Sequence, residues 1–143
     1  LTPGMAYQLS RCCSPIKGDT IVGIISAGSG VSVHTIDCKN LEYFSNMPER
    51  WLDVSWTNEN RNTKLLVTRI KVTIINKPGS LGIISTVIGR NNANISNIHF
   101  DNRDNDFYEL SVDLEVRDLN HLNNIIAAIR LESITTSVLR IKG

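Results

Sequence analysis

Alternating apolar and polar residues predict four strands in the second half of the chain. The clearest run, residues 108–116, places five apolar side chains on one face and four polar ones on the other. Residues 70–74 alternate in the same way, and residues 94–100 do so with a break in phase that predicts a β-bulge. The mixed pattern of residues 134–141 predicts the last strand. Residues 101–106 are all polar and predict a hairpin loop between the second and third strands.

Two helices are predicted between these strands. Apolar residues recur at helical spacing over residues 81–88 and again over residues 119–129. Pro78 and Gly79 break the chain before the first helix, and Ser80 is expected as its N-cap. Asp118 is the expected N-cap of the second helix.

The order strand, helix, strand, strand, helix, strand is typical of one fold class. It predicts an α+β unit of the ferredoxin-like βαββαβ type. Both crossovers should be right-handed, which places the two helices on one face of the sheet. The other face is expected to be open or covered by a partner.

The first half is less regular and predicts a small α/β module that contains the cysteines. Short strands are expected over residues 20–25 and 31–34, a short helix over residues 37–44, and a last strand over residues 51–56.

A polar stretch divides the two halves. Residues 57–64 contain no apolar side chain and are typical of a linker or exposed loop. We therefore expect a first domain over residues 1–57, a linker over residues 58–67 and a second domain over residues 68–143.

Composition narrows the classes of function. The 143 residues are 41% hydrophobic and carry a formal net charge of +1, with neither half strongly basic, so a strong electrostatic footprint for nucleic acid is absent. An apolar run of about 18 residues is also absent, and no membrane span is predicted. Three cysteines, two of them adjacent, argue against a disulfide framework and favour a reducing cytoplasm.

The cysteines and one histidine form the sharpest candidate site. Three thiols and one imidazole match the ligand set of a closed structural zinc site. The adjacent pair differs from the usual CxxC spacing, and buried cysteines also serve as small apolar residues. Zinc binding and simple packing both stay open for Cys12, Cys13, His34 and Cys38.

A second candidate site is the turn over residues 76–81, which opens the first helix. Free N–H groups and the helix dipole at such a turn favour an anion or a carboxylate, although many turns of this kind bind nothing. The carboxylates of residues 108–116 are expected on a solvated strand face. The sequence therefore predicts binding and regulation, with no catalytic residues.

Several motifs together resemble a known family. They are the segments 11–19 (RCCSPIKGD), 21–23 (IVG), 28–34 (GSGVSVH), 37–38 (DC), 48–50 (PER) and 54–56 (VSW). They resemble the C-terminal region of the RelA/SpoT family, enzymes that make and hydrolyse the alarmone (p)ppGpp. Segments 78–81 (PGSL) and 94–95 (NI) resemble the ACT domain that ends those proteins.

The resemblance implies a role without catalysis. The hydrolase and synthetase domains of the family are not found in these residues, so we expect a regulatory segment of a GTP diphosphokinase/ppGpp hydrolase in the cytoplasm. The ACT domain would form a homodimer or bind a small amino acid, and the first module would dock on the ribosome or on tRNA. A stand-alone amino-acid-binding sensor and a structural dimerisation module are the alternatives.

Residue by residue, the resemblance implies two sites. The four thiol and imidazole residues match the family's cysteine-rich, zinc-finger-like module and would hold a structural zinc ion. In the ACT domain the expected ligand-binding positions are Asn76, Gly79, Ser80, Leu81, Gly82, Asn94 and Ile95. Asn76 and Lys77 stand where the family commonly has an acidic residue and Arg, which removes a charged partner for a ligand ammonium group. We therefore expect pairing through the sheet to outweigh amino-acid capture.

Overall fold

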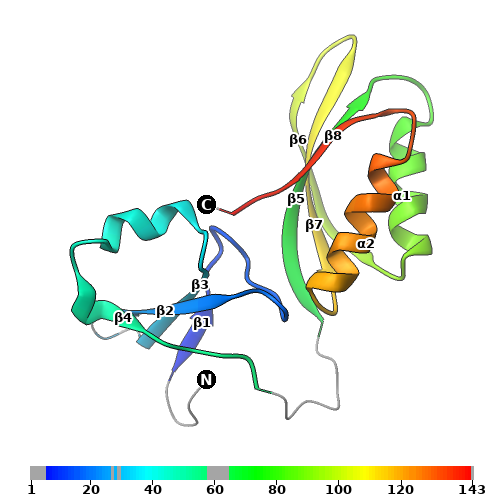
Figure 1. Cartoon of the computed structure of the whole chain (residues 1–143). Coiled ribbons are helices and arrows are strands. Elements are labelled where there is room, and N and C mark those ends of the chain that lie inside the picture. The colour runs from blue at the N-terminus through cyan, green and yellow to red at the C-terminus, as the bar shows by residue number, and fades with distance from the viewer. Residues whose placement is uncertain (1–5, 27, 29, 58–64, 143) are drawn as a thin grey trace.

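Two four-stranded sheets make up the chain, for which a computed structural model describes residues 6–26, 28, 30–57 and 65–142 (Figure 1). The core of the predicted linker, residues 58–64, lies outside the described residues.

The first sheet has the order β1-β3-β2-β4. Its strands are β1 (Tyr7–Leu9), β2 (Ile21–Ser26), β3 (Gly30–Thr35) and β4 (Trp51–Leu52), with the 3₁₀ helices η1 (Lys39–Phe44) and η2 (Pro48–Arg50) between the last two. β2 and β3 confirm the predicted strands. The strand expected over residues 51–56 is wrong beyond Leu52, because only two residues pair with β2. The sequence did not predict β1, which is too short to show an alternating pattern.

The second sheet has the order β6-β7-β5-β8 and confirms the ferredoxin-like fold. Its elements are β5 (Leu66–Ile75), α1 (Ser80–Arg90), β6 (Asn94–Arg103), β7 (Phe107–Val116), α2 (Leu119–Arg130) and β8 (Thr135–Arg140). Figure 1 shows both helices on one side of this sheet, as the handedness rule requires. None of the helices in the described ranges is long and apolar enough to cross a membrane.

The alternating pattern of β7 decides which face of the sheet is covered. Leu110, Val112, Leu114 and Val116 are all 0% exposed and form one hydrophobic core with the apolar faces of α1 and α2. The intervening side chains lie on the opposite face, where Asp113 pairs with Arg69 at 2.7 Å.

The β6–β7 hairpin differs from prediction in its length. A register shift between Ile95 and Asn97 confirms the expected irregularity. However, β6 continues to Arg103, so residues 101–103, expected in the loop, belong to the strand. The Asp104 carboxylate closes the turn, because it accepts the backbone N–H groups of Asp106 and Phe107 at 2.8 and 2.7 Å.

The two helices begin in different ways. Asp118 is confirmed as the N-cap of α2, since its carboxylate accepts the backbone N–H of His121 at 2.8 Å. The prediction for α1 is wrong by one residue. Gly79, with a φ of 85°, is the N-cap, and Ser80 is already helical with its hydroxyl buried and unpartnered among the described residues. A left-handed φ at this position favours glycine.

The cap of α2 can be tested by substitution. Asp118→Ala removes the acceptor for the His121 N–H and should lower the free energy of unfolding by about 1 kcal/mol. Asp118→Asn keeps a good cap and serves as the matched control. Urea denaturation followed by circular dichroism measures both, and equal losses for Ala and Asn would contradict the capping role.

Candidate functional site

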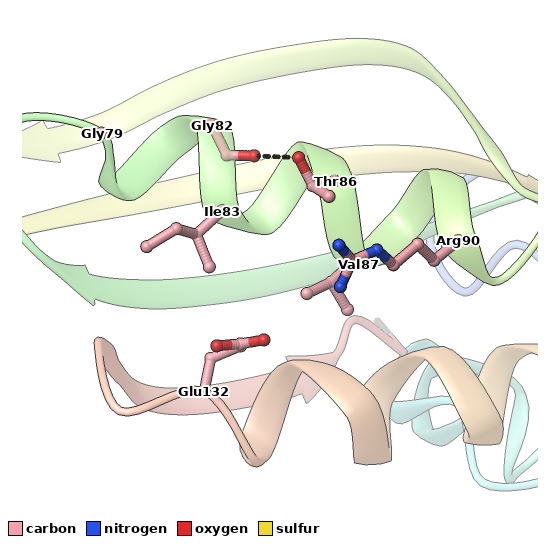
Figure 2. Close-up of a pocket in the computed structure, with 7 residues that line it drawn as sticks. All are labelled: Gly79, Gly82, Ile83, Thr86, Val87, Arg90 and Glu132. Atoms are coloured by element: carbon pink, nitrogen blue, oxygen red, sulfur yellow. Dashed lines mark hydrogen bonds between the residues drawn. The ribbon is translucent and has the colours of Figure 1, made fainter.

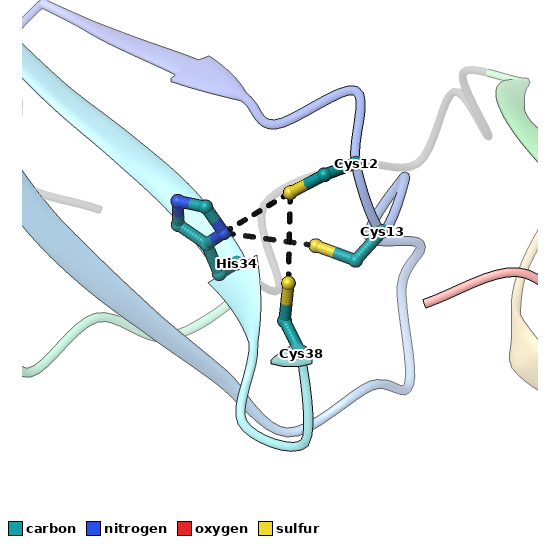
Figure 3. Close-up of side chains that lie close together, drawn as sticks. All are labelled: Cys12, Cys13, His34 and Cys38. Carbon is teal, nitrogen blue, oxygen red and sulfur yellow. Dashed lines mark hydrogen bonds between the residues drawn. The ribbon is translucent and has the colours of Figure 1, made fainter. Parts of the chain in front are cut away.

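A tight turn after β1 brings the adjacent cysteines to one place. The backbone N–H of Ser14 donates to the carbonyl of Ser10 at 2.9 Å, and Ser14 has a φ of 46°. This compact turn places Cys12 and Cys13 beside β3, and Figure 3 shows both sulfurs pointing toward the His34 ring. Adjacency in sequence is therefore no obstacle to a shared site.

The other two members come from β3 and from the turn that joins it to η1. His34 lies on β3, and Cys38 is the N-cap residue of η1. The backbone N–H of Cys38 donates to the Thr35 carbonyl at 3.0 Å, which closes the turn between them. The turn after β1, the strand β3 and the turn before η1 together form the cluster.

The distances within the cluster fit a tetrahedral metal. Cys12 Sγ lies 3.5 Å from His34 Nδ1 and 3.5 Å from Cys38 Sγ, and Cys13 Sγ lies 3.9 Å from His34 Nδ1. All four ligand atoms lie within 4.8 Å of one another. Zinc bonds of about 2.3 Å to sulfur and about 2.0 Å to nitrogen would separate ligand atoms by roughly 3.5 to 3.8 Å. The cluster could therefore bind a metal ion.

Burial shapes the protonation of the thiols. Burial raises the pKa of Cys13 to about 12, helped by the nearby Cys12 and Cys38, and also raises the pKa of Cys38. Burial opposes ionisation of Cys12 too, but hydrogen bonds from Ser10 and Cys38 outweigh it and lower the pKa of Cys12. A divalent cation would offset the cost of ionising the buried thiols, so its binding releases protons.

His34 is held in the form that a metal requires. Its side chain is buried, and burial lowers its pKa below the ordinary value of 6.5. The neutral imidazole therefore dominates at pH 7 and keeps a lone pair for a ligand bond.

The cluster is also part of a small core. Cys13 and Cys38 pack with Val22, Ile24 and Leu41 in one buried apolar cluster. Both expectations for the cysteines, metal binding and packing, are therefore compatible with the same arrangement.

The second candidate site is a shallow pocket of about 330 Å³ at the turn before α1. It brings together four of the seven ligand-binding positions expected from the sequence: Asn76, Gly79, Leu81 and Gly82. The other three, Ser80, Asn94 and Ile95, do not line it. Ser80 is buried, and Asn94 and Ile95 begin β6, whereas the pocket lies near the end of that strand.

Three residues of this pocket were missed by sequence reasoning. Phe100 and Tyr108 lie edge to face with ring centroids 5.4 Å apart, and the Arg103 guanidinium lies 5.6 Å from the Tyr108 ring centroid. With Lys77, Arg103 gives the pocket two cations suited to a carboxylate. The Asn76 amide donates to the Asp104 carbonyl at 2.6 Å, so its side chain holds the hairpin. The predicted hairpin was the one indication in the sequence, because pairing of β6 with β7 brings Phe100 and Tyr108 close together.

A larger hollow of about 430 Å³ lies along α1 (Figure 2). It shares Gly79 and Gly82 with the first pocket and reaches Arg90 and Glu132. The Thr86 hydroxyl donates to the Gly82 carbonyl at 2.8 Å, so one polar side chain of the hollow is already satisfied within the helix. Gly79 and Gly82 add no side chains to the start of this hollow, and Ile83, Val87 and Arg90 line the rest of it along α1.

Comparison with known proteins places the chain in a family. The model of the RelA/SpoT RIS domain matches residues 1–57, and that of an ACT domain matches residues 62–140. A solved ACT domain from the GTP pyrophosphokinase of Chlorobium tepidum overlays on 54% of the chain with 19% identity and a TM-score of 0.48.

Two curated relatives match both domains at once. The chain is 38% identical over 128 residues to the GTP pyrophosphokinase rsh of Brucella abortus (strain 2308). This match covers 90% of this chain and 17% of that protein. It is 31% identical over 128 residues to the bifunctional (p)ppGpp synthase/hydrolase SpoT of Escherichia coli (strain K12), with 90% of this chain and 18% of that protein covered. The chain belongs to the RelA/SpoT family, and its RIS and ACT domains correspond to the regulatory region of that family.

Proposed function

We propose that this chain is a non-catalytic regulatory segment that controls (p)ppGpp synthesis and hydrolysis in a RelA/SpoT-type protein. The observation that carries the proposal is the pairing of a RIS domain with an ACT domain in a chain that spans only 17% and 18% of two catalytic relatives. We propose a first domain over residues 1–57, a linker over residues 58–67 and an ACT domain over residues 68–143, in a protein of the cytoplasm. The last two residues of that linker, Leu66 and Val67, already pair in β5.

Regulation in this proposal is a shift between two states of the catalytic part. A partner or ligand that contacts one state better than the other changes their populations by its difference in affinity. The first domain would dock on the ribosome or on tRNA, and the ACT domain would pair or bind a ligand. Exposed Tyr43, beside Lys39 in a shallow surface hollow, supports docking because a ring and a cation suit unpaired RNA bases.

Zinc is the metal we propose for Cys12, Cys13, His34 and Cys38. The donor set is that of structural zinc sites, and four protein ligands leave no open position of the kind that a catalytic zinc requires. The ion would tie the turn after β1 to β3 and η1, and so stabilise a module with a small apolar core.

A homodimer through the edge of the ACT sheet is supported by β6. This strand is ten residues long, lies at the edge of the second sheet and exposes 40% of Phe100. Long edge strands with unpaired backbone groups are templates for pairing with another chain. The amino-acid sensor is the second candidate, and the cationic pair Lys77 and Arg103 favours it through the ligand carboxylate.

Cobalt substitution tests the metal site. The metal-free chain should take up one equivalent of Co²⁺ and show the strong absorption of thiolate-to-cobalt charge transfer, which zinc then abolishes. Cys38→Ala should lose this signal because it removes one of four ligands, whereas His99→Ala, an exposed histidine outside the cluster, should keep it. Affinity should weaken as the pH falls, because protons compete for the thiolates. A wild-type chain that takes up no cobalt or zinc would favour the packing role.

Activity assays test the regulatory role. The isolated chain should neither make nor hydrolyse (p)ppGpp under conditions in which the full-length bifunctional (p)ppGpp synthase/hydrolase SpoT of Escherichia coli does both. When this chain replaces the matching 128 residues of SpoT, Cys38→Ala within the replacement should change the ratio of synthesis to hydrolysis by about fivefold or more. Activity of the isolated chain, or a ratio unaffected by the variant and by removal of the whole segment, would contradict the proposal.

Light scattering separates pairing from ligand sensing. The chain, of 15.9 kDa, should have twice that mass without any ligand. Phe100→Asp should produce monomers because it puts a charge on β6, whereas Leu131→Asp, at a position 87% exposed after α2, should not. A monomer whose melting temperature rises with valine or isoleucine would instead identify the sensor.

A further inference from the structure

A loop of the first domain is seated in the ACT domain. Ile16 follows the cysteines by three residues, yet its side chain is 0% exposed and belongs to the hydrophobic core of the second sheet. It packs in the same cluster as Ile70 of β5 and Leu122 of α2. We name residues 14–19 the bridging loop. The ACT core is therefore completed by a side chain from outside the ACT domain.

A buried ion pair holds the far end of the bridging loop. Arg140 of β8 donates to both carboxylate oxygens of Asp19 at 2.6 Å, and the two side chains are 7% and 3% exposed. The same guanidinium donates to the Ser14 carbonyl at 3.1 Å, and Asp19 also accepts the Ile16 N–H at 2.8 Å. Removing either partner would leave a buried charge uncompensated, which is strongly destabilising.

The bridging loop also meets the start of α2. The N–H of Leu119, the first residue of the helix, donates to the Lys17 carbonyl at 2.7 Å. Such N-terminal N–H groups have no partner within their own helix. Gly18, at a φ of +106°, lies so close that a Cβ there would be 2.9 Å from the Leu119 Cβ. The approach of loop to helix therefore requires glycine.

Contacts on the other side connect the cysteine cluster to the same end of the ACT domain. Asp37, next to Cys38, pairs with Lys142 at 2.8 Å, and the Lys39 N–H donates to the Lys142 carbonyl at 3.5 Å. Two segments beside the cluster thus contact the end of the ACT domain. The bridging loop, after Cys13, contacts β8, and the residues around Cys38 contact Lys142.

We propose that the bridging loop joins the cysteine cluster and the ACT domain into one cooperative unit, so that occupation of the cluster stabilises α1, α2 and their sheet. Folding of each domain then depends on the other, and a signal at either site reaches the other through Ile16 and the Asp19–Arg140 pair. The cooperative unit itself does not depend on the proposed control of (p)ppGpp.

The chain carries a natural probe for each half. Its two tryptophans, Trp51 and Trp56, both lie in the first domain, and both α-helices lie in the ACT domain. Urea unfolding followed by tryptophan fluorescence and by helical circular dichroism should give one common midpoint. Two separate midpoints in the wild-type chain would overturn the proposal.

Ile16→Ala should lower the midpoint of the helical signal by about 1 M urea, because it opens a cavity in the ACT core. Ile36→Ala, at a position 53% exposed in the same domain, is the matched control and should leave the midpoint unchanged. Arg140→Gln is a second variant that should also weaken the unit and separate the two signals. A helical midpoint that neither Ile16→Ala nor Arg140→Gln changes would overturn the proposal.

The effect of zinc on urea unfolding is the last part of the test. Zinc should raise the helical midpoint of the wild-type chain, and raise it less in Ile16→Ala, while cobalt absorption shows that the variant still binds metal. Equal increases in both proteins would overturn the coupling. If the wild-type chain binds no metal, the metal proposal fails, and the common midpoint and its response to Ile16→Ala still decide the coupling.

Discussion

Burial of one face of the ACT sheet is the constraint on which the rest of the structure depends. The apolar side chains of β7 alternate strictly, and the four from Leu110 to Val116 are fully buried beneath α1 and α2. A shift of one residue would move all of them to the polar face, so the register of the central strands is strongly determined. That register in turn places the turn before α1, the pocket beside it and the edge strand β6.

The first domain is stabilised differently because its own core is small. Among the described residues, its buried apolar cluster consists of Val22, Ile24 and Leu41 beside Cys13 and Cys38. Domains of this size are marginally stable because they bury a smaller fraction of their surface, and metals, cross-links or partners add to their stability. In this domain the four residues that could bind a metal lie in or beside the core, and the bridging loop inserts Ile16 into the larger domain. A domain built in this way suits regulation, because modest changes at its site alter its stability and its contacts.

The candidate sites differ in how they suit a ligand. The cysteine cluster is compact and largely buried, with its four candidate ligand atoms within 4.8 Å of one another. The pocket before α1 is shallow, and Asn76 uses its amide to hold the β6–β7 hairpin. Its cations, Lys77 and Arg103, are suited to a carboxylate. Close packing at the first site suits a structural ion, and openness at the second suits an exchangeable ligand or partner.

Local patterns in the sequence by themselves determined the βαββαβ order, the irregularity in β6 and the cap of α2, because alternation, helical spacing and capping are local properties. The types of the cluster residues were also readable, as were the motifs shared with the RelA/SpoT family. Only the tertiary structure decided that a turn makes adjacent Cys12 and Cys13 share one site, and that Phe100 and Arg103 line the pocket in place of Asn94. The Asp19–Arg140 pair joins residues 121 positions apart. No local pattern encodes such a contact, since it arises only when two domains fold against each other.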